Sequence, residues 1–127
     1  MILVDSSVWI DHLRTPIGQV LDLANQELLL THPFIIGEIA LGSLKNRAKV
    51  LANLDLLPKA IVANDDEVLT LIDSHRLFGL GIGYADAHLL ASTLLTDAAK
   101  LWTFDRRLRL AADQLNCIAS MPGKSSG

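Results

Sequence analysis

Cysteine is almost absent from this sequence of 127 residues. The lone Cys117 provides neither a disulfide framework nor the paired spacing of a zinc site, which fits a reducing, cytoplasmic environment. Aromatic residues make up only 5%, and no stretch resembles an RNA-reading module with stacked aromatics. The net charge of −3 argues mildly against non-specific binding of nucleic acid, although it says little about a local patch.

Long hydrophobic runs are also missing, although 50% of the residues are hydrophobic. The uncharged stretches between Glu27 and Glu38 and between Asp86 and Asp97 fall short of the ~20 residues that a membrane-spanning helix needs. The N-terminus has no basic region, and Asp5 interrupts its apolar stretch, so we expect no export signal. So much apolar material in one short chain predicts a self-association surface, hence a homodimer.

Apolar, β-branched runs alternate with helical patterns along the chain. This order predicts an α/β fold, a three-layer α/β/α sandwich around a mostly parallel sheet of about five strands. One domain is expected over residues 1–120, followed by a loose tail over 121–127. The predicted strands are Ile2–Val4, Leu28–Leu30, Ala60–Ala63, Leu101–Phe104 and, more weakly, Cys117–Ala119. The predicted helices are Val8–Arg14, Ile17–Gln26, Phe34–Leu44, Ala48–Leu56, Asp66–Leu77, Tyr84–Leu95 and Arg106–Gln114.

Isolated carboxylates are the most informative feature of the sequence. Asp5 is the only charged residue among the first ten, Glu38 the only one from 28 to 44, and Asp86 the only one from 77 to 96. Asp105 follows a predicted strand in the segment LWTFD. An ionised carboxylate held away from water without a partner costs several kcal/mol, so each of them needs a proton, a cation or a metal ion.

The predicted topology brings these acids together. Asp5 and Asp105 follow the carboxyl ends of two strands, and Glu38 and Asp86 fall in the first turns of helices that cover the sheet. Carboxylates about 4 Å apart repel each other by roughly 4 kcal/mol, and Mg²⁺ or Mn²⁺ removes this repulsion through oxygen ligands. Ser6 and Thr103 are expected to support the site by donating hydrogen bonds to the carboxylates or to metal-bound water.

Each residue also has a purely structural interpretation. Asp5 and Asp105 are good helix caps, Asp86 suits the first turn of a helix, and Glu38 can pair with a distant arginine. We expect His88 to pack rather than to act as a base. Arg106 and Arg107 either bind phosphates of an RNA or form a solvated helix face.

Together these motifs carry a family resemblance. Asp5-Ser6 after the first strand, PFIIGEIALG around Glu38, GYADAHLLAS around Asp86 and LWTFD ending at Asp105 resemble the PIN domain, in particular the VapC-type toxins of toxin–antitoxin pairs. The resemblance covers about residues 1–119. Two positions depart from it: Ser6 stands where many relatives have threonine, and Arg106 follows the last acid where relatives often have another acid or polar residue.

The resemblance implies a Mg²⁺- or Mn²⁺-dependent endoribonuclease in which a metal-activated water attacks RNA. The acidic quartet would map onto Asp5, Glu38, Asp86 and Asp105, as catalytic residues and metal ligands. It also implies a homodimer and a cognate VapB-type antitoxin that obstructs the acidic pocket. The alternatives are a non-catalytic partner-binding module with the same fold, or a metal-dependent DNA nuclease or phosphatase that uses the same acids.

Overall fold

The computed structural model describes residues 1–123, and residues 124–127 lie outside the described part. Strands and helices alternate along it, as the sequence predicts. The strands are β1 (Ile2–Val4), β2 (Leu29–Leu30) and β3 (Lys100–Trp102). The helices are α1 (Ser6–Arg14), α2 (Gly18–Asn25), α3 (Pro33–Ala40), α4 (Arg47–Asp55), α5 (Asp65–Ser74), α6 (Tyr84–Leu95) and α7 (Arg106–Gln114).

The three strands form a parallel sheet in the order β2-β1-β3, which confirms the predicted α/β class. β1 lies in the centre, where Leu3 pairs with Leu30 on one side and with Leu101 on the other. Both Leu3 and Val4 are 0% exposed. A strand covered on both faces has no polar face to present, which explains its unbroken apolar sequence.

The predicted count of five strands is wrong for the described residues. The segments over 60–63 and 117–119 run beside the sheet, but each is associated with only a single bridge, Thr31–Lys59 and Leu101–Ile118. In the first segment, backbone N–H groups donate to side chains of α6 and its cap instead of to a strand. Ile61 N donates to Thr96 Oγ1 at 2.9 Å and Ala63 N donates to Ser92 Oγ at 3.1 Å. Side-chain hydroxyls therefore accept the hydrogen bonds that a neighbouring strand would accept in a sheet.

The helices begin where local side chains satisfy their first N–H groups. Asn64 and Glu67 form a reciprocal capping box at α5, and Asp5 and Asp105 cap α1 and α7. α3 ends at Ala40, four residues earlier than predicted. There the Arg47 side chain donates twice to the Ala40 carbonyl, at 2.8 and 3.0 Å, and so satisfies a terminal acceptor.

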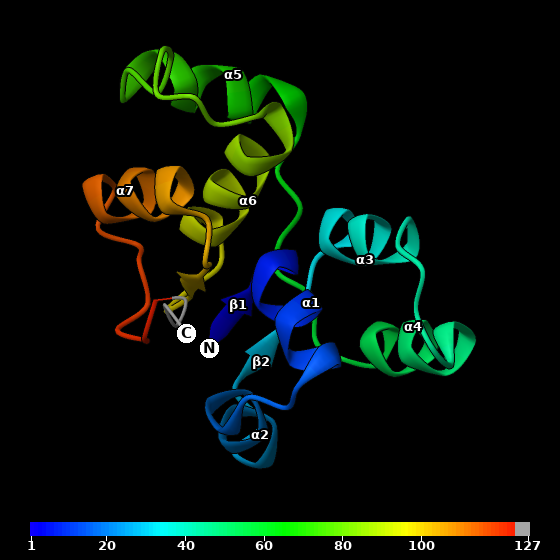
Figure 1. Cartoon of the computed structure of the whole chain (residues 1–127). Coiled ribbons are helices and arrows are strands. Elements are labelled where there is room, and N and C mark those ends of the chain that lie inside the picture. Colours follow the sequence, from blue (N-terminus) through cyan, green and yellow to red (C-terminus); the bar gives the residue numbers. More distant parts are fainter. Residues whose placement is uncertain (124–127) are drawn as a thin grey trace.

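Figure 1 shows α6 and α7 on one side of β1, α3 and α4 on the other, and α1 between them. α1 packs on α3, α3 on α4, and α6 on β3 and α5. Trp102 is fully buried, and its indole N–H donates to the carbonyl of Pro122 at 2.9 Å, so the start of the predicted tail contacts β3. The three-layer arrangement stays a prediction. None of the helices described over residues 1–123 has the length and apolar character to cross a membrane.

Candidate active site

The register of the sheet brings the ends of β1 and β3 together. Val4 pairs with Trp102, and the next residue, Asp5, donates its backbone N–H to the Trp102 carbonyl at 2.9 Å. Asp5 therefore lies beside Thr103, although 98 residues separate them. This is the edge at which an open parallel sheet places its ligands.

Asp5 is only 5% exposed and is held by hydroxyl groups. Its Oδ2 atom accepts from Ser7 Oγ at 2.7 Å, from Thr103 Oγ1 at 2.8 Å and from the Ser7 N–H at 3.4 Å. All three hydrogen bonds end on Oδ2, so Oδ1 has no hydrogen-bond partner in residues 1–123. The carboxylate is fixed through one oxygen, and the other remains available for a ligand.

Glu38 and Asp86 come from helices on opposite sides of β1. Ser6 Oγ donates to Glu38 Oε2 at 3.2 Å, as predicted for this hydroxyl. Gly83 N donates to Asp86 Oδ2 at 3.2 Å, which places Asp86 in the first turn of α6. The sequence predicts Glu38 in the first turn of its helix, and this is wrong: Glu38 lies in the second turn of α3. α3 begins at Pro33, where the His32 ring accepts the Phe34 N–H as the cap.

Asp105 combines the two interpretations that the sequence leaves open. Its Oδ1 accepts the Leu108 N–H at 2.9 Å, so it caps α7. Its Oδ2 has no hydrogen-bond partner in the described part of the chain. Asp5, Glu38, Asp86 and Asp105 therefore share one pattern: one carboxylate oxygen accepts a hydrogen bond, and the other accepts none from residues 1–123. Capping and ligand binding are compatible at this site.

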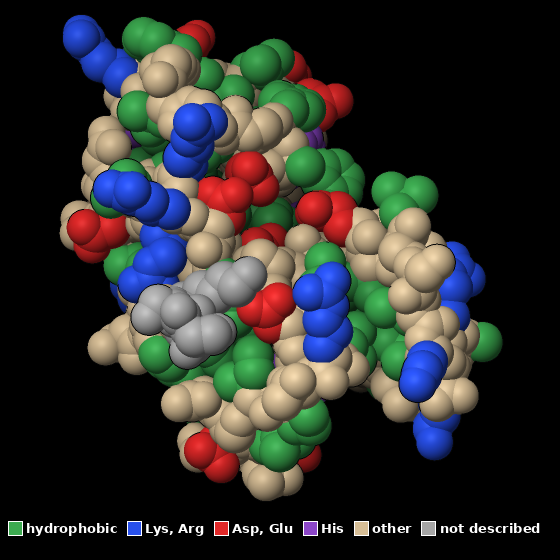
Figure 2. Space-filling model, in the orientation of Figure 1, with side chains coloured by type: hydrophobic (Ala, Val, Ile, Leu, Met, Phe, Trp, Pro, Cys, Tyr) green, Lys and Arg blue, Asp and Glu red, His purple; other side chains and the backbone are tan. Residues whose placement is uncertain are grey.

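The four carboxylates act on each other electrostatically. Desolvation raises the pKa of Glu38, the charges of Asp5 and Asp86 raise it further, and the Ser6 hydrogen bond opposes the shift. Desolvation also raises the pKa of Asp86 against its hydrogen bond from Gly83, and the charges of Asp5 and Asp105 add to the rise. Figure 2 shows acidic side chains gathered at the centre of one face, between α6–α7 and α1–α3. All four acids thus belong to one cluster.

No lysine or arginine neutralises this cluster within residues 1–123. The two ion pairs of the described part are Lys59–Asp55 and His88–Asp65, and neither includes a member of the cluster. The atoms available as metal ligands are carboxylate and hydroxyl oxygens, and Mg²⁺ and Mn²⁺ prefer oxygen ligands. Among the described residues, no group of three acidic, histidine or cysteine side chains is arranged to hold a metal ion by itself. A spaced cluster suits Mg²⁺, which keeps several waters and takes only one or two carboxylates directly.

The predicted phosphate contacts lie on α7, directly after Asp105. Arg106 and Arg107 are both exposed. Arg107 covers the loop that leads into α6: a Cβ added at Gly81 would lie 2.7 Å from Arg107 Nη1. Gly81 has φ +77°, a left-handed backbone conformation that favours glycine. Arg107 thereby connects the start of α7 to the start of α6, near two of the acids.

Comparison with known proteins identifies the family. A family model of the PIN domain matches residues 2–114. The chain belongs to the PIN-domain family. This PIN domain is 47% identical over 111 residues to Ribonuclease VapC32 of Mycobacterium tuberculosis, in strains CDC 1551 / Oshkosh and ATCC 25618 / H37Rv. The match covers 87% of this chain and 90% of each relative. The predicted resemblance to VapC-type PIN domains is confirmed.

Two features of this PIN domain are not part of the site predicted from sequence. Ser7 is one of them: its hydroxyl donates to Asp5, approaches Thr103 Oγ1 at 3.2 Å and accepts the Phe104 N–H at 3.0 Å. A second cluster joins α5 to α6, where Asp65 Oδ1 accepts from Tyr84 Oη at 2.7 Å and lies 3.0 Å from His88 Nε2. Sequence spacing gives the Tyr84–His88 pair, four residues apart on one helix, but not its partner.

The raised pKa values predict a pH dependence of stability in metal-free buffer. A carboxyl whose pKa is higher in the folded state binds its proton more tightly there, so stability falls as pH rises from its ordinary pKa through the raised value. Glu38 has an ordinary pKa of 4.5. We expect the melting temperature of Glu38→Gln in EDTA to exceed that of the wild type by a margin that grows from pH 4 to pH 7. Thermal melts at several pH values measure this margin.

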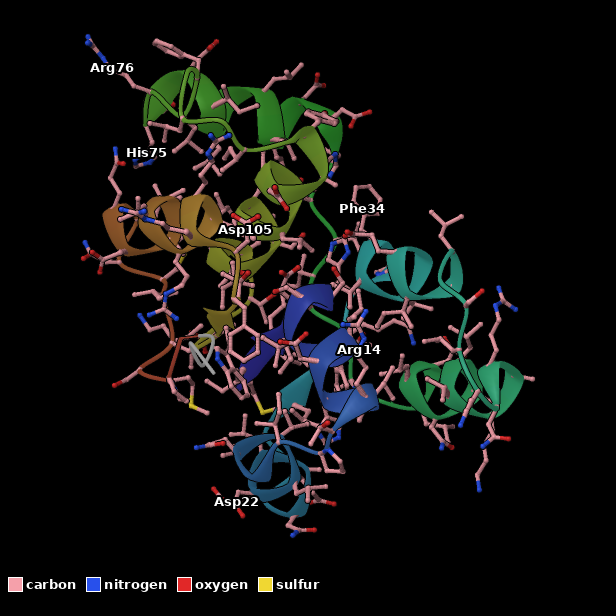
Figure 3. The ribbon with its side chains drawn as sticks, viewed as in Figure 1. Arg14, Asp22, Phe34, His75, Arg76 and Asp105 are labelled. Carbon is pink, nitrogen blue, oxygen red and sulfur yellow. The ribbon has the colours of Figure 1, made fainter. Side chains whose placement is uncertain are left out.

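Asp22→Asn on α2 is the matched control, because Asp22 is exposed and lies far from the cluster (Figure 3). Its difference from the wild type should not grow over the same pH range. A margin for Glu38→Gln that shrinks toward neutral pH would contradict the electrostatic coupling of the four acids.

Proposed function

We propose that this PIN domain is a Mg²⁺- or Mn²⁺-dependent endoribonuclease, the toxin of a VapC-type toxin–antitoxin pair. One observation carries the proposal: within residues 1–123, four carboxylates from α3, α6 and the two strand ends interact electrostatically without a paired cation, and each has one oxygen without a hydrogen bond. The similarity to Ribonuclease VapC32 supports the choice of RNA as substrate.

Asp5 and Asp86 would hold the ion directly, and Glu38 and Asp105 directly or through water. Bound there, the ion would supply positive charge for the phosphodiester and lower the pKa of the attacking water. The hydroxyls of Ser7 and Thr103 keep the Asp5 carboxylate in one orientation, because both bind its Oδ2. Ser6 does the same for Glu38. This fixed orientation is what positions a nucleophile and a substrate with little reorganisation.

In-line attack of water on phosphorus breaks the bond to the leaving 3′-oxygen. The products are a 5′-phosphate and a 3′-hydroxyl, and the ribose 2′-hydroxyl takes no part. Arg107, beside the loop that leads into α6, and Arg106 are the proposed contacts to phosphates next to the scissile one. Single-stranded RNA suits this arrangement, because an A-form duplex hides its bases and presents a more rigid backbone.

A groove beside Glu38 suits the proposed antitoxin. The groove has a volume of ≈ 860 Å³, which is large enough for a few side chains of a docked peptide. Its walls come from α1, α3, α4 and the loop between α3 and α4. They combine apolar side chains with a basic rim: Ile10, Leu13, Ile39, Leu44 and Val50, with Arg14, Lys45 and Lys49. A VapB-type segment with apolar and acidic residues complements it.

A homodimer also belongs to the proposal. Large apolar side chains remain exposed on α6 and on the segment that follows α4, including Ile61, Val62, Leu94 and Leu95 at 40 to 55%. Apolar surface of this kind favours contact between copies of the chain.

Side-by-side cleavage assays test the proposed activity. tRNA, mRNA, single-stranded DNA and a phosphomonoester are incubated with the protein and Mg²⁺ or Mn²⁺, and the new RNA 5′ ends are mapped. We expect cleavage of RNA alone, with 5′-phosphate ends that accept ligation without prior treatment. Cleavage confined to DNA, or phosphate release confined to the monoester, would contradict the ribonuclease and support a DNA nuclease or a phosphatase.

A further inference from the structure

Exposed aromatic side chains stand next to the acidic cluster. Few aromatic residues occur in this chain, and Trp9 and Trp102 are buried in the core. Phe34 and Tyr84, in contrast, are 37% and 47% exposed. Both lie in the first turns of the two helices that carry Glu38 and Asp86. Their exposure costs hydrophobic free energy, so a role at the surface is a reasonable explanation for it.

Their placement relative to the acids follows from helix geometry. Phe34 precedes Glu38 by four residues, so the two side chains share one face of α3 about one turn apart. Tyr84 and Asp86 are two residues apart on α6 and so point to different faces, and Tyr84 instead contacts Asp65 and His88. Figure 3 shows Phe34 at the end of α3 that faces α6. Both rings contact His88, so Tyr84 lies beside Phe34, and Phe34 is the ring about one turn from Glu38.

The buried His88 ring contacts both exposed rings and holds them in place. His88 is 4% exposed, and its ring centroid lies 4.7 Å from that of Phe34 and 4.8 Å from that of Tyr84. Asp65 fixes this arrangement, because its Oδ1 binds both His88 Nε2 and Tyr84 Oη. His32 accepts the Phe34 N–H at 3.0 Å and contacts the Phe34 ring at 5.2 Å. Little side-chain entropy remains for these rings to lose when a ligand binds.

We propose that Phe34 and Tyr84 form a stacking platform for unpaired bases of the RNA next to the scissile phosphate. The proposal rests on the proposed ribonuclease function and adds how the substrate is held. Stacking on aromatic rings tolerates any base and needs a strand whose bases are free to splay out. The acidic cluster repels phosphates until a cation is bound, so stacking provides an attraction that is independent of charge.

RNA binding by variants in an Asp5→Asn background tests the platform, because that background separates binding from cleavage. The probe is a fluorescein-labelled, unstructured oligoribonucleotide, and affinity is measured by fluorescence anisotropy in EDTA. We expect Phe34→Ala to weaken binding roughly 5- to 100-fold, the range for loss of one base–aromatic stack. Tyr84→Ala should weaken it similarly, whereas Tyr84→Phe, which keeps the ring, should bind nearly as the parent does.

Controls decide whether the effect comes from stacking. Leu21→Ala on α2 removes an exposed apolar side chain, 49% accessible, at a distance from both rings, and should bind as the parent does. An oligonucleotide of equal length with abasic positions should bind the parent and Phe34→Ala with equal affinity. If Phe34→Ala fails to fold, Phe34→Leu replaces it in the binding assay. Leucine keeps an apolar side chain but has no π face, so this variant should also bind the oligoribonucleotide more weakly than the parent.

Two results would overturn the platform. One is unchanged affinity of Phe34→Ala and Tyr84→Ala for the probe. The other is a change in oligomeric state of Phe34→Ala by light scattering, which would make these rings a contact between copies. The proposed function fails separately: stacking-dependent binding in a protein that cleaves no RNA would keep the platform and reject the nuclease.

Discussion

Asp5→Asn and Asp86→Asn are each expected to abolish RNA cleavage, with a loss of roughly 100-fold or more in rate. The expected size follows from removal of a main charge-stabilising group at a reaction centre. Asparagine retains an oxygen that accepts the local hydrogen bonds, such as those from Ser7 and Thr103 to Asp5, but it removes the negative charge. A labelled RNA cleavage assay and growth inhibition on induction in cells measure the loss.

Thermal melts in metal-free buffer distinguish chemistry from folding in these variants. Both should be as stable as the wild type or more stable, because the substitution relieves repulsion within the cluster. Asp22→Asn serves as the control that keeps full activity. Strong destabilisation of both active-site variants without metal would indicate that the two carboxylates are structural, and the loss of cleavage would then say nothing about catalysis.

Chelation is expected to stop cleavage completely. EDTA should remove activity, and excess Mg²⁺ or Mn²⁺ should restore it, because the four carboxylates have no other cation among residues 1–123. Isothermal calorimetry should show divalent-metal heat with the wild type and much less with Asp86→Asn. The same titration tests the non-catalytic alternative, since a module that only binds partners would release no such heat.

Thermal melts provide a second measurement of metal binding. Mg²⁺ should raise the melting temperature of the wild type at neutral pH more than that of Asp5→Asn, because ligand binding to the folded state stabilises it by mass action. Full cleavage in the presence of chelator would exclude the metal-dependent mechanism.

Of the four isolated acids only Asp5 is buried, Asp86 is half-buried, and Glu38 and Asp105 are exposed, so isolation of a charge in the sequence predicts burial for Asp5 alone. An isolated Asp5 after an apolar run marks the end of a central strand, and the register of β1 against β3 then brings it beside Thr103. Helices α6 and α7 were predicted at their observed bounds, since Gly83 and Asp105 supply clear starts.

Other features depend on distant partners and were missed for that reason. The segment over 60–63 has the composition of a strand, but Ser92 and Thr96 take its N–H groups. The end of α3 depends on Arg47, seven residues beyond Ala40. The link from Asp65 to Tyr84 and His88 joins two helices, and no local pattern indicates it.

The central position of β1 has a consequence for synthesis. Of the three described strands β1 is synthesised first, yet one of its two neighbours, β3, comes almost a hundred residues later. Asp5 cannot meet Thr103 or Asp105 until that late segment has emerged, so a partly translated chain carries no assembled cluster. A fragment that ends before residue 100 therefore lacks the assembled cluster, and the proposed cleavage requires a chain that extends beyond Asp105.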